Sequence, residues 1–372
     1  MKKVGIIGGG QLGRMMAMEA KDLDVFISVL DPTPNCPAAF YADEHIVGDF
    51  SDKDTVLAFG HGKDVLTFEI ESANAEALLE LEEQGIKIHP SPKTLSIIKD
   101  KFLQKEFLTE HGIPSAPYAV VETSSDIERF AERYGYPLVL KARRGAYDGR
   151  GNRTLESAKD IDVMMNELGD GLYVEAWVPF TKELAVVAVR GEDKTVHTYP
   201  VVETIHVDHI CDIVIAPASV SGEVKEKATS LARKILEVFK GAGVFGIEMF
   251  LTKDKEVLIN EIAPRVHNSG HLTLGGSNVS QFAQHMRAVC GKSLSAPEML
   301  GTVVVMKNIL GARNASADPQ GIDSAEALGA RVEIYGKHET KMKRKMGHLT
   351  VIADTEDEAL RIAIEAHGCI SI

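Results

Sequence analysis

The chain has 372 residues, of which 44% are hydrophobic and 26% are charged, and its formal net charge at pH 7 is -13. This length accommodates two or three domains with a full-sized core, and the composition is ordinary for a soluble globular protein. The acidic balance argues against nucleic acid as a general partner, because there is no net basic field to neutralise phosphates.

The sequence also lacks the marks of export and of membrane insertion. The first residues lead straight into an apolar strand, and no apolar run approaches about 18 residues. The cysteines are scattered without a C-x-x-C pair, which is typical of free thiols in a reducing compartment. We therefore expect a cytoplasmic protein that has no membrane partner and whose cysteines are structural: Cys36, Cys211, Cys290 and Cys369.

The first domain is predicted at residues 1–98. Apolar strands at 3–8, 25–31, 64–71 and 86–91 alternate with helical or polar stretches, as in a parallel α/β sheet. The first strand leads into the spacing Gly8-x-Gly10-x-x-Gly13 and an amphipathic helix, where a phosphate can approach the positive end of the helix. Asp31 ends the second strand about where a dinucleotide fold has its ribose-binding acid. A nicotinamide-dependent enzyme is one interpretation, although many α/β domains share this spacing.

The second domain is predicted at 99–295, and a third, rich in strands, at 296–372. A capped helix beginning near Ser91 ends before Gly112, Pro114 and Pro117, which are typical of a domain junction. A compact mobile subdomain at about 114–176 holds strands at 118–122, 136–143 and 172–178 and a helix at 124–135. The remaining predicted elements are a half-buried strand at 182–190, a helix at about 222–240, strands at 243–251, 256–264, 302–310, 330–336 and 348–353, and a closing helix at 355–367.

A pair of carboxylates is predicted on one face of a hairpin, "GIEMFLTKDKEVLINEIAPR". If Asp254 and Lys255 form a two-residue turn, counting outward places Glu248 opposite Glu261. Because opposed like charges destabilise a sheet, a divalent cation would resolve the conflict, and Mg²⁺ held against ligand phosphates fits such ligands. The alternative is an edge hairpin with solvated acids. The same count puts Asn260 on the other face unless a bulge intervenes.

A glycine-rich loop is predicted at residues 143–152, "RRGAYDGRGN", whose N–H groups and guanidinium can surround a phosphate. Lys141 adds a cation at the base of this loop. Taken alone, the stretch can also be an ordinary surface turn. Further along, "YVEAWV" ends a strand beside the only Trp of the chain. That arrangement suits a purine base, and it is also how ordinary core strands end.

A polar stretch, "RVHNSGH", directly follows the second carboxylate. Zinc between His267 and His271 is disfavoured, because Ser269-Gly270 breaks the helical geometry that such a pair needs. Hydrogen bonding is the commoner use of histidine at such a loop.

A basic stretch lies near the end of the acidic chain, "YGKHETKMKRKMGH". A charge run is usually a solvated face. Here its local positive field favours an anion such as a sugar phosphate. The basic residues are Lys337, Lys341, Lys343, Arg344 and Lys345.

Taken in order, these motifs resemble a known family. The sequence carries "GGGQLGRM", "DVLTFEIE", "AYDGRGN", "EAWVPFTKELAV", "PVVETIH", "FGIEMF", "INEIAPRVHNSGH", "SQFAQHMRAV" and "RKMGH", as do 5-(carboxyamino)imidazole ribonucleotide synthases, ATP-grasp ligases of purine biosynthesis. The resemblance runs from Met1 to about His348. It implies an α/β and α+β chain: an ATP-grasp fold with an N-terminal Rossmann-like pre-ATP-grasp domain and a small C-terminal β-rich domain.

The implied reaction is the carboxylation of the amine of 5-aminoimidazole ribonucleotide, which consumes ATP and bicarbonate and releases ADP and phosphate. ATP and Mg²⁺ are the implied cofactors, and a homodimer is the implied assembly. The glycine turn would then serve the ribonucleotide instead of a dinucleotide, and Asp31 would be an ordinary acid at a strand end.

The resemblance also implies roles for individual residues. It assigns the nucleotide to Lys101, Lys141, Ala146, Tyr147, Asp148, Gly149, Arg150, Gly151, Asn152, Glu175, Ala176, Trp177, Val178, Glu183, His206, Asn260 and Glu261, with Mg²⁺ on Glu248 and Glu261. It assigns the ribonucleotide to Gln11, Leu12, Glu71, Ser269, Lys337, Arg344 and Lys345. The amine and bicarbonate would be surrounded by Tyr147, Asp148, Arg150, Arg265, His267 and Asn268, and Asp148 would accept the proton of the amine.

Other functions stay open at this point. Formate-dependent glycinamide ribonucleotide transformylases share the glycine turn, the metal acids and the phosphate cluster, whereas "AYDGRGN" and "HNSGH" favour the carboxylating enzyme. An NAD(P)-dependent oxidoreductase would leave the carboxylate hairpin and the basic stretch without a role. A chain that binds ATP without catalysis would not need both metal acids and Asp148.

Overall fold

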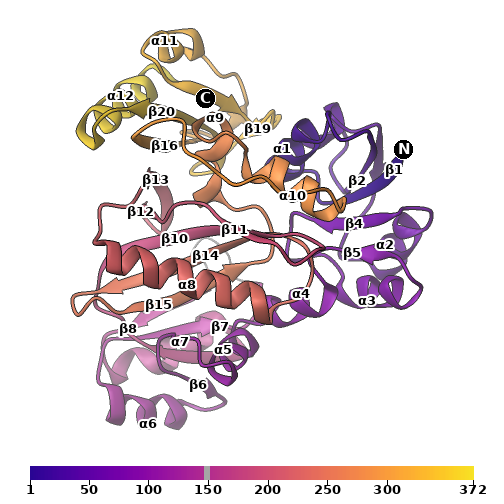
Figure 1. Cartoon of the computed structure of the whole chain (residues 1–372). Coiled ribbons are helices and arrows are strands. Elements are labelled where there is room, and N and C mark those ends of the chain that lie inside the picture. Colours follow the sequence, from indigo (N-terminus) through magenta and orange to yellow (C-terminus); the bar gives the residue numbers. More distant parts are fainter. Residues whose placement is uncertain (146–150) are drawn as a thin grey trace.

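The computed structural model describes residues 1–145 and 151–372, and its N-terminal part is a parallel sheet with strand order β3-β2-β1-β4-β5 (Figure 1). Strands β1 and β2 are buried through Val4, Ile6, Val29 and Leu30, which explains their continuous apolar runs. The elements are β1 (Lys2–Ile7), α1 (Gln11–Glu19), β2 (Val25–Asp31), η1 (Pro37–Phe40), β3 (Glu44–Val47), α2 (Lys53–Gly60), β4 (Val65–Phe68), α3 (Ala75–Glu83) and β5 (Lys87–Ile88). The predicted parallel α/β architecture is confirmed.

Two helices stand where the sequence predicts one, namely α4 (Pro92–Lys99) and α5 (Lys101–Glu110). The single-helix prediction was wrong because Asp100 interrupts the helix. Its carboxylate accepts the backbone N–H groups of Phe102 at 3.1 Å and Leu103 at 3.2 Å and so caps α5. The same carboxylate pairs with Arg143 at 2.8 Å and with Arg144 at 3.2 Å. Asp100 therefore ties the start of α5 to the two residues that directly follow β7.

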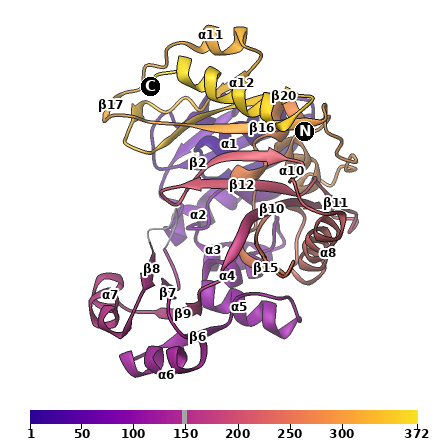
Figure 2. The ribbon, with the colours of Figure 1, turned by 90° about the vertical axis from the view of Figure 1, so that its left-hand side faces the viewer.

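A small antiparallel sheet with strand order β6-β9-β7-β8 follows. Figure 2 shows this sheet and its helices at the end of the molecule opposite α12. Its core includes Ile127, Leu138, Leu140 and Val174. The elements are β6 (Tyr118–Val121), α6 (Ser124–Tyr134), β7 (Leu138–Ala142), β8 (Asn152–Leu155), η2 (Ala158–Asp160), α7 (Ile161–Leu168) and β9 (Leu172–Ala176).

A long antiparallel sheet occupies the centre, with strand order β15-β14-β10-β12-β13-β16-β20-β18 and β11 paired to β10. Because β13 pairs with β16, the strands of the last part of the chain extend the central sheet. Its strands are β10 (Phe180–Arg190), β11 (Val196–Thr198), β12 (Val202–Val207), β13 (Ile210–Ala216), β14 (Gly243–Thr252), β15 (Val257–Ala263), β16 (Val303–Leu310), β18 (Arg331–Ile334) and β20 (Lys345–Ala353). A separate two-stranded ribbon joins β17 (Ala315–Ser316) to β19 (Glu339–Thr340).

Helices cover both faces of this sheet around β10 (Figure 1). Val186 and Ala188 pack with α8 in one core, whereas Val187 and Val189 pack with α10 and α1 in another. The predicted half-buried strand at 182–190 is thus buried on both faces over 184–189, because a helix lies on each side. The remaining helices are α8 (Gly222–Val238), η3 (Asn268–Gly270), α9 (Thr273–Gly276), α10 (Gln281–Val289), α11 (Ile322–Ala327) and α12 (Glu356–Cys369).

The described residues contain no helix that is long and apolar enough to cross a membrane. All four cysteines carry free thiols, as expected, and Cys369 is the exposed one.

Candidate active site

The β14–β15 hairpin places Glu248 opposite Glu261, as predicted. The route to this register differs from the prediction. Thr252 donates its N–H to the carbonyl of Glu256 at 3.0 Å, so the turn spans residues 253–255, with Lys255 in the left-handed region at φ 60°. The predicted two-residue turn was therefore wrong by one residue. A bulge between Ile259 and Glu261 restores the predicted pairing of Glu248 with Glu261 and leaves Asn260 unpaired. A bulge here is the condition under which Asn260 was not expected on the opposite face.

The two carboxylates differ in their proton affinity. Burial and the neighbouring Glu261 raise the pKa of Glu248 to about 7. Burial alone would also raise the pKa of Glu261, but Lys101, whose Nζ lies 2.9 Å away, lowers it below its ordinary value. A carboxylate pair in which one member holds a proton near neutral pH is an arrangement that a cation would stabilise.

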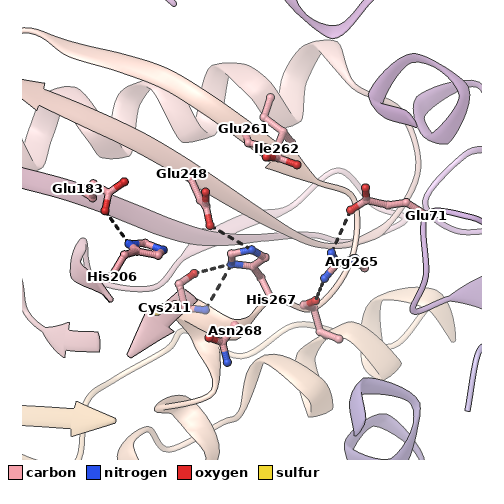
Figure 3. A network of polar contacts seen from close by, with 12 residues as sticks. Glu71, Glu183, His206, Cys211, Glu248, Glu261, Ile262, Arg265, His267 and Asn268 are labelled. Atoms are coloured by element: carbon pink, nitrogen blue, oxygen red, sulfur yellow. Dashed lines mark hydrogen bonds and ion pairs between the residues drawn. The ribbon is translucent and has the colours of Figure 1, made fainter. Parts of the chain in front are cut away.

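The imidazole of His267 lies beside Glu248, with Nε2 at 3.4 Å from the nearer carboxylate oxygen (Figure 3). Its Nδ1 lies 2.9 Å from the hydroxyl oxygen of Ser269. Burial, helped by Arg265, lowers the pKa of His267 to about 3, so the ring is neutral. The side chain crosses Gly246 of β14, where an added Cβ would lie 2.3 Å from the Cβ of His267. A glycine at this position is what lets the imidazole approach the carboxylates.

Further polar pairs surround this centre (Figure 3). Glu183 on β10 pairs with Nδ1 of His206 on β12 at 2.6 Å. Burial alone would lower the pKa of His206, but the Glu183 carboxylate outweighs burial and raises it. Arg265, in the segment after β15, pairs with Glu71 at 3.0 Å. That contact joins the central sheet to the N-terminal domain.

The segment 265–271 is held by hydrogen bonds from two buried residues that were not predicted from the sequence. Gln281, at the start of α10, accepts the N–H of His267 at 2.9 Å and donates to its carbonyl at 2.6 Å. Asn308 on β16 exchanges two hydrogen bonds with the amide of Asn268, at 2.8 and 3.1 Å. Both supporting residues are fully buried. The main chain around the predicted catalytic residues is therefore fixed by the core.

The glycine turn is filled by a side chain of the protein itself. Glu69 accepts the N–H groups of Gly10 at 2.5 Å and Gly13 at 2.6 Å, so its carboxylate lies at the N-terminus of α1. Asp31, expected to be an ordinary strand-end acid, instead accepts the N–H of Gly9 at 2.8 Å and that of Thr33 at 2.8 Å. The amides of Gln11 and Leu12 occupy first-turn positions that have no partner within a helix. The assignment of Gln11 and Leu12 to the ribonucleotide stays a prediction.

A buried ion pair stands at the proposed nucleotide strand. Glu175 on β9 binds Lys141 of β7 at 3.0 Å and faces Lys105 of α5 at 3.3 Å. Ala176 ends the strand, and Trp177 and Val178 follow it. Trp177 is 44% exposed, so an apolar surface lies open beside the strand end.

The basic stretch divides into two groups. Lys337 donates to the carbonyl of Lys345 at 2.6 Å and lies over the ring of Tyr335 at 5.6 Å, which brings these two lysines together. Arg344 precedes Lys345 and donates to the carbonyl of Glu339 at 2.7 Å. The other two lysines of the stretch form exposed ion pairs, Lys341 with Glu339 and Lys343 with Asp208. These two lysines lie on a solvated face, which is the usual location of a charge run.

Family models match the chain in three consecutive parts. They are a ribonucleotide synthetase preATP-grasp domain at residues 1–99, an ATP-grasp domain at 106–282 and a phosphoribosylaminoimidazole carboxylase C-terminal domain at 304–362. The structure of N5-carboxyaminoimidazole ribonucleotide synthetase from Thermotoga maritima is similar with a TM-score of 0.91 at 42% identity, covering 100% of this chain and 99% of that one. This chain belongs to the N5-carboxyaminoimidazole ribonucleotide synthase family. The predicted family and the ATP-grasp fold are confirmed.

Two further relatives bear on this family's ligands and size. The Aspergillus clavatus enzyme, solved in complex with ADP and 5-aminoimidazole ribonucleotide, has a TM-score of 0.90 at 39% identity, over 99% of this chain and 98% of that one. The phosphoribosylaminoimidazole carboxylase of Ogataea methanolica is 43% identical over 96% of this chain and 68% of its own length. The chain thus spans about two thirds of that longer relative.

Part of the predicted synthase site falls outside the described residues, namely Ala146, Tyr147, Asp148, Gly149 and Arg150. Next to this segment, the carbonyl of Gly151 accepts the N–H of Ala142 at 2.9 Å. Asn152 pairs with Lys141 across β7 and β8, and within the described part of the chain its buried Oδ1 lacks a hydrogen-bond partner.

Glu69 and Lys105 are site residues for which the sequence held a weak signal. Glu69 ends an apolar run next to the strand that carries the glycine turn, and the carboxyl ends of neighbouring parallel strands meet. Lys105 follows Lys101 by four residues and so shares its helix face. Gln281 and Asn308 left no such signal, because their contacts join residues 14 and 40 positions apart that lie on different elements.

Proposed function

We propose that this chain carries out the reaction of its family, the carboxylation of 5-aminoimidazole ribonucleotide with ATP and bicarbonate to N5-carboxyaminoimidazole ribonucleotide, ADP and phosphate. The observation that supports it most directly is the opposed pair Glu248 and Glu261 beside Lys101 and His267. Phosphoryl transfer needs this kind of charge arrangement, since its catalysis is positioning plus electrostatic stabilisation. We also propose that the chain is a cytoplasmic homodimer.

The carboxylate pair fits Mg²⁺. Among residues 1–145 and 151–372, no three His, Cys, Asp or Glu side chains gather as a metal cage. The metal would therefore be held by Glu248 and Glu261 together with phosphate oxygens, a coordination that Mg²⁺ adopts in ATP-dependent enzymes. When bound, Mg²⁺ would offset charge on the transferring phosphoryl group.

The residues of the chain would act in two steps. In the first, a bicarbonate oxygen attacks the terminal phosphorus of ATP, the bond to ADP breaks, and Lys101 and Lys141 hold the phosphates in line. The resulting carboxyphosphate releases phosphate and CO₂. In the second, the amine nitrogen attacks CO₂ and loses a proton, and we assign Asp148 as the group that accepts this proton. Neutral His267 and the Arg265–Glu71 pair would position the acceptor, and exclusion of water would protect carboxyphosphate.

Measurement of ADP release in the presence of bicarbonate, with and without 5-aminoimidazole ribonucleotide, tests the proposal. We expect the ribonucleotide to stimulate ADP release and product to form in equal amount. Lack of stimulation would refute the assignment. Formate with glycinamide ribonucleotide, assayed in parallel, would reveal the transformylase alternative.

A further inference from the structure

Glu175 is a buried carboxylate that has two ammonium partners. One oxygen accepts a hydrogen bond from Nζ of Lys141 at 3.0 Å, and the other lies 3.3 Å from Nζ of Lys105. The Glu175 side chain is only 4% exposed. Burial lowers the pKa of Lys105, and the Glu175 carboxylate beside it opposes that effect and favours the ammonium form. With both lysines protonated, this buried carboxylate has one more cation than it needs for neutrality.

The two lysines differ in how firmly they are held. Lys105 comes from the buried face of α5, is 2% exposed, and also donates to the carbonyl of Ile259 at 3.4 Å. Lys141 lies near the end of β7, is 12% exposed, and precedes the glycine-rich loop. Lys141 is also the residue proposed to hold nucleotide phosphate. Of the two, Lys141 is the cation that can change its partner.

The transfer of Lys141 from Glu175 to a phosphate needs a remaining cation at Glu175. A buried carboxylate without a counter-ion is strongly unfavourable, and it either retains its last cation or takes up a proton. With Lys105 in place, Glu175 stays paired while Lys141 engages the ligand. Without Lys105, every ADP or ATP molecule would compete with Glu175 for the same ammonium group.

We infer that Lys105 is a positioning residue that remains on Glu175 as a fixed counter-ion and thereby releases Lys141 to the phosphates of a bound nucleotide. This inference rests on the proposed function, in that Lys141 binds the nucleotide.

The surroundings of Glu175 support this role. Charged and titratable groups face Glu175 from α5 (Lys105), from β7 (Lys141) and from its own strand (Tyr173). The carboxylate of Glu261 on β15 also raises the pKa of Lys105. Burial alone would raise the pKa of Glu175, but the two lysines lower it to about 2. Removal of Lys105 takes away the largest effect that lowers the pKa of Glu175, so this carboxylate should titrate at a higher pH.

Nucleotide affinity of the variant Lys105→Met, measured across pH, tests this inference. Trp177, the only Trp of the chain, lies two residues after Glu175, so its fluorescence can report binding of ADP. ADP without Mg²⁺ is the probe, because the metal site then contributes nothing. The quantity compared is the dissociation constant of the variant divided by that of the parent at each pH, which cancels the titration of ADP itself.

We expect this ratio to rise at least fivefold between pH 6 and pH 8. In the variant Glu175 has lost one of its two cations, so its pKa is expected to rise; protonation of Glu175 as the pH falls then frees Lys141, whereas at high pH the ionised carboxylate retains its only cation. A ratio that does not change with pH, in a parent that binds ADP, would overturn the role of Lys105 alone. Failure of the parent to bind ADP would refute the proposed function and this inference with it.

Two further variants secure the test. Lys105→Met combined with Glu175→Gln leaves no lone buried charge, so it is expected to fold, and its ratio should not vary with pH. A ratio that still rises with pH in this double variant would show that another group titrates and would overturn the inference. Lys227→Met, which removes an exposed lysine of α8, is the control for loss of one positive charge.

Discussion

At the scale of single residues, Glu248 makes metal binding depend on pH. Its pKa of about 7, raised by burial and Glu261, means that the carboxylate carries a proton at pH 6 and has lost it at pH 8. Mg²⁺ must displace that proton, so its apparent dissociation constant with ADP bound is expected to be about tenfold higher at pH 6 than at pH 8. Titration calorimetry in buffers of different ionisation enthalpy measures both the affinity and the proton released. An identical pH dependence in Glu248→Gln would contradict the assignment to this residue.

The opposite carboxylate is predicted to be indispensable. Glu261→Gln removes a charge from the proposed metal site and leaves Lys101 without its partner at 2.9 Å. We expect Mg²⁺-dependent cleavage of ATP to fall by at least about 10²-fold, since the loss affects charge stabilisation in the transition state. Phosphate release under saturating ATP is the measurement. Turnover at the parental rate would remove Glu261 from the proposed metal site.

The carboxylate of Glu69 is expected to control the affinity for the ribonucleotide. Glu69→Gln turns one acceptor oxygen into a donor that faces the N–H of Gly10 or Gly13, so the turn that presents Gln11 and Leu12 should shift. The KM for 5-aminoimidazole ribonucleotide should rise about tenfold, whereas the KM for ATP should change less than twofold. Asp64→Asn is a matched control, because Asp64 also accepts a backbone N–H, from Lys3, at an exposed site. Equal changes in both KM values would argue against this role.

At the scale of elements, the substitution Gly246→Ala in β14 is predicted to impair catalysis. An alanine Cβ there would lie 2.3 Å from the Cβ of His267, so the imidazole must move away from Glu248. A displacement of about 1 Å at a catalytic group can cost about 10²-fold in rate, and we expect such a fall in kcat. Gly222→Ala, at the first residue of α8 where an added Cβ meets nothing within 4 Å, should keep parental activity. If both variants behave alike, the packing argument is wrong.

Elements with a strong local pattern could be predicted from the sequence, and those that depend on tertiary contacts could not. The apolar runs of β1, β2, β14 and β15 predicted their strands, and counting outward from an assumed two-residue turn paired Glu248 with Glu261. The left-handed Lys255 and the bulge at Asn260 escaped prediction, because neither position carries the glycine that usually marks such backbone. Their one-residue errors cancelled.

The same limit applies to the supporting residues of the site. Lys105 and Gln281 are polar residues on helices, where a surface position is the usual expectation. For Gln281, only burial against the segment 265–271 reveals a role. For Lys105, the contact with Glu175 of β9 adds to the weak signal of its four-residue spacing from Lys101. Candidate residues for the chemistry can therefore be proposed from sequence motifs, whereas the residues that hold the segment 265–271 in place are recognised only from tertiary contacts.

At the scale of the whole molecule, Arg14 and Glu333 join the first helix to a strand near the other end of the chain. Their side chains are 11% and 12% exposed, and breaking a buried pair on one side typically costs about 3–5 kcal/mol. Arg14→Met is expected to lower the free energy of unfolding in urea by about that amount. Arg361→Met removes an exposed pair with Glu365 and should cost less than about 0.5 kcal/mol. Similar losses in the two variants would show that the Arg14 contact does not stabilise the assembly of the domains.

The pairing of β13 with β16 has a consequence for shortened forms of the protein. A chain that ended before residue 303 would lack β16, β18 and β20, and β13 would present a row of unpaired N–H and C=O groups. Open strand edges pair readily with other chains. An early stop codon or proteolytic loss of this region should therefore yield aggregates, and a peptide that supplies the missing strands should suppress them.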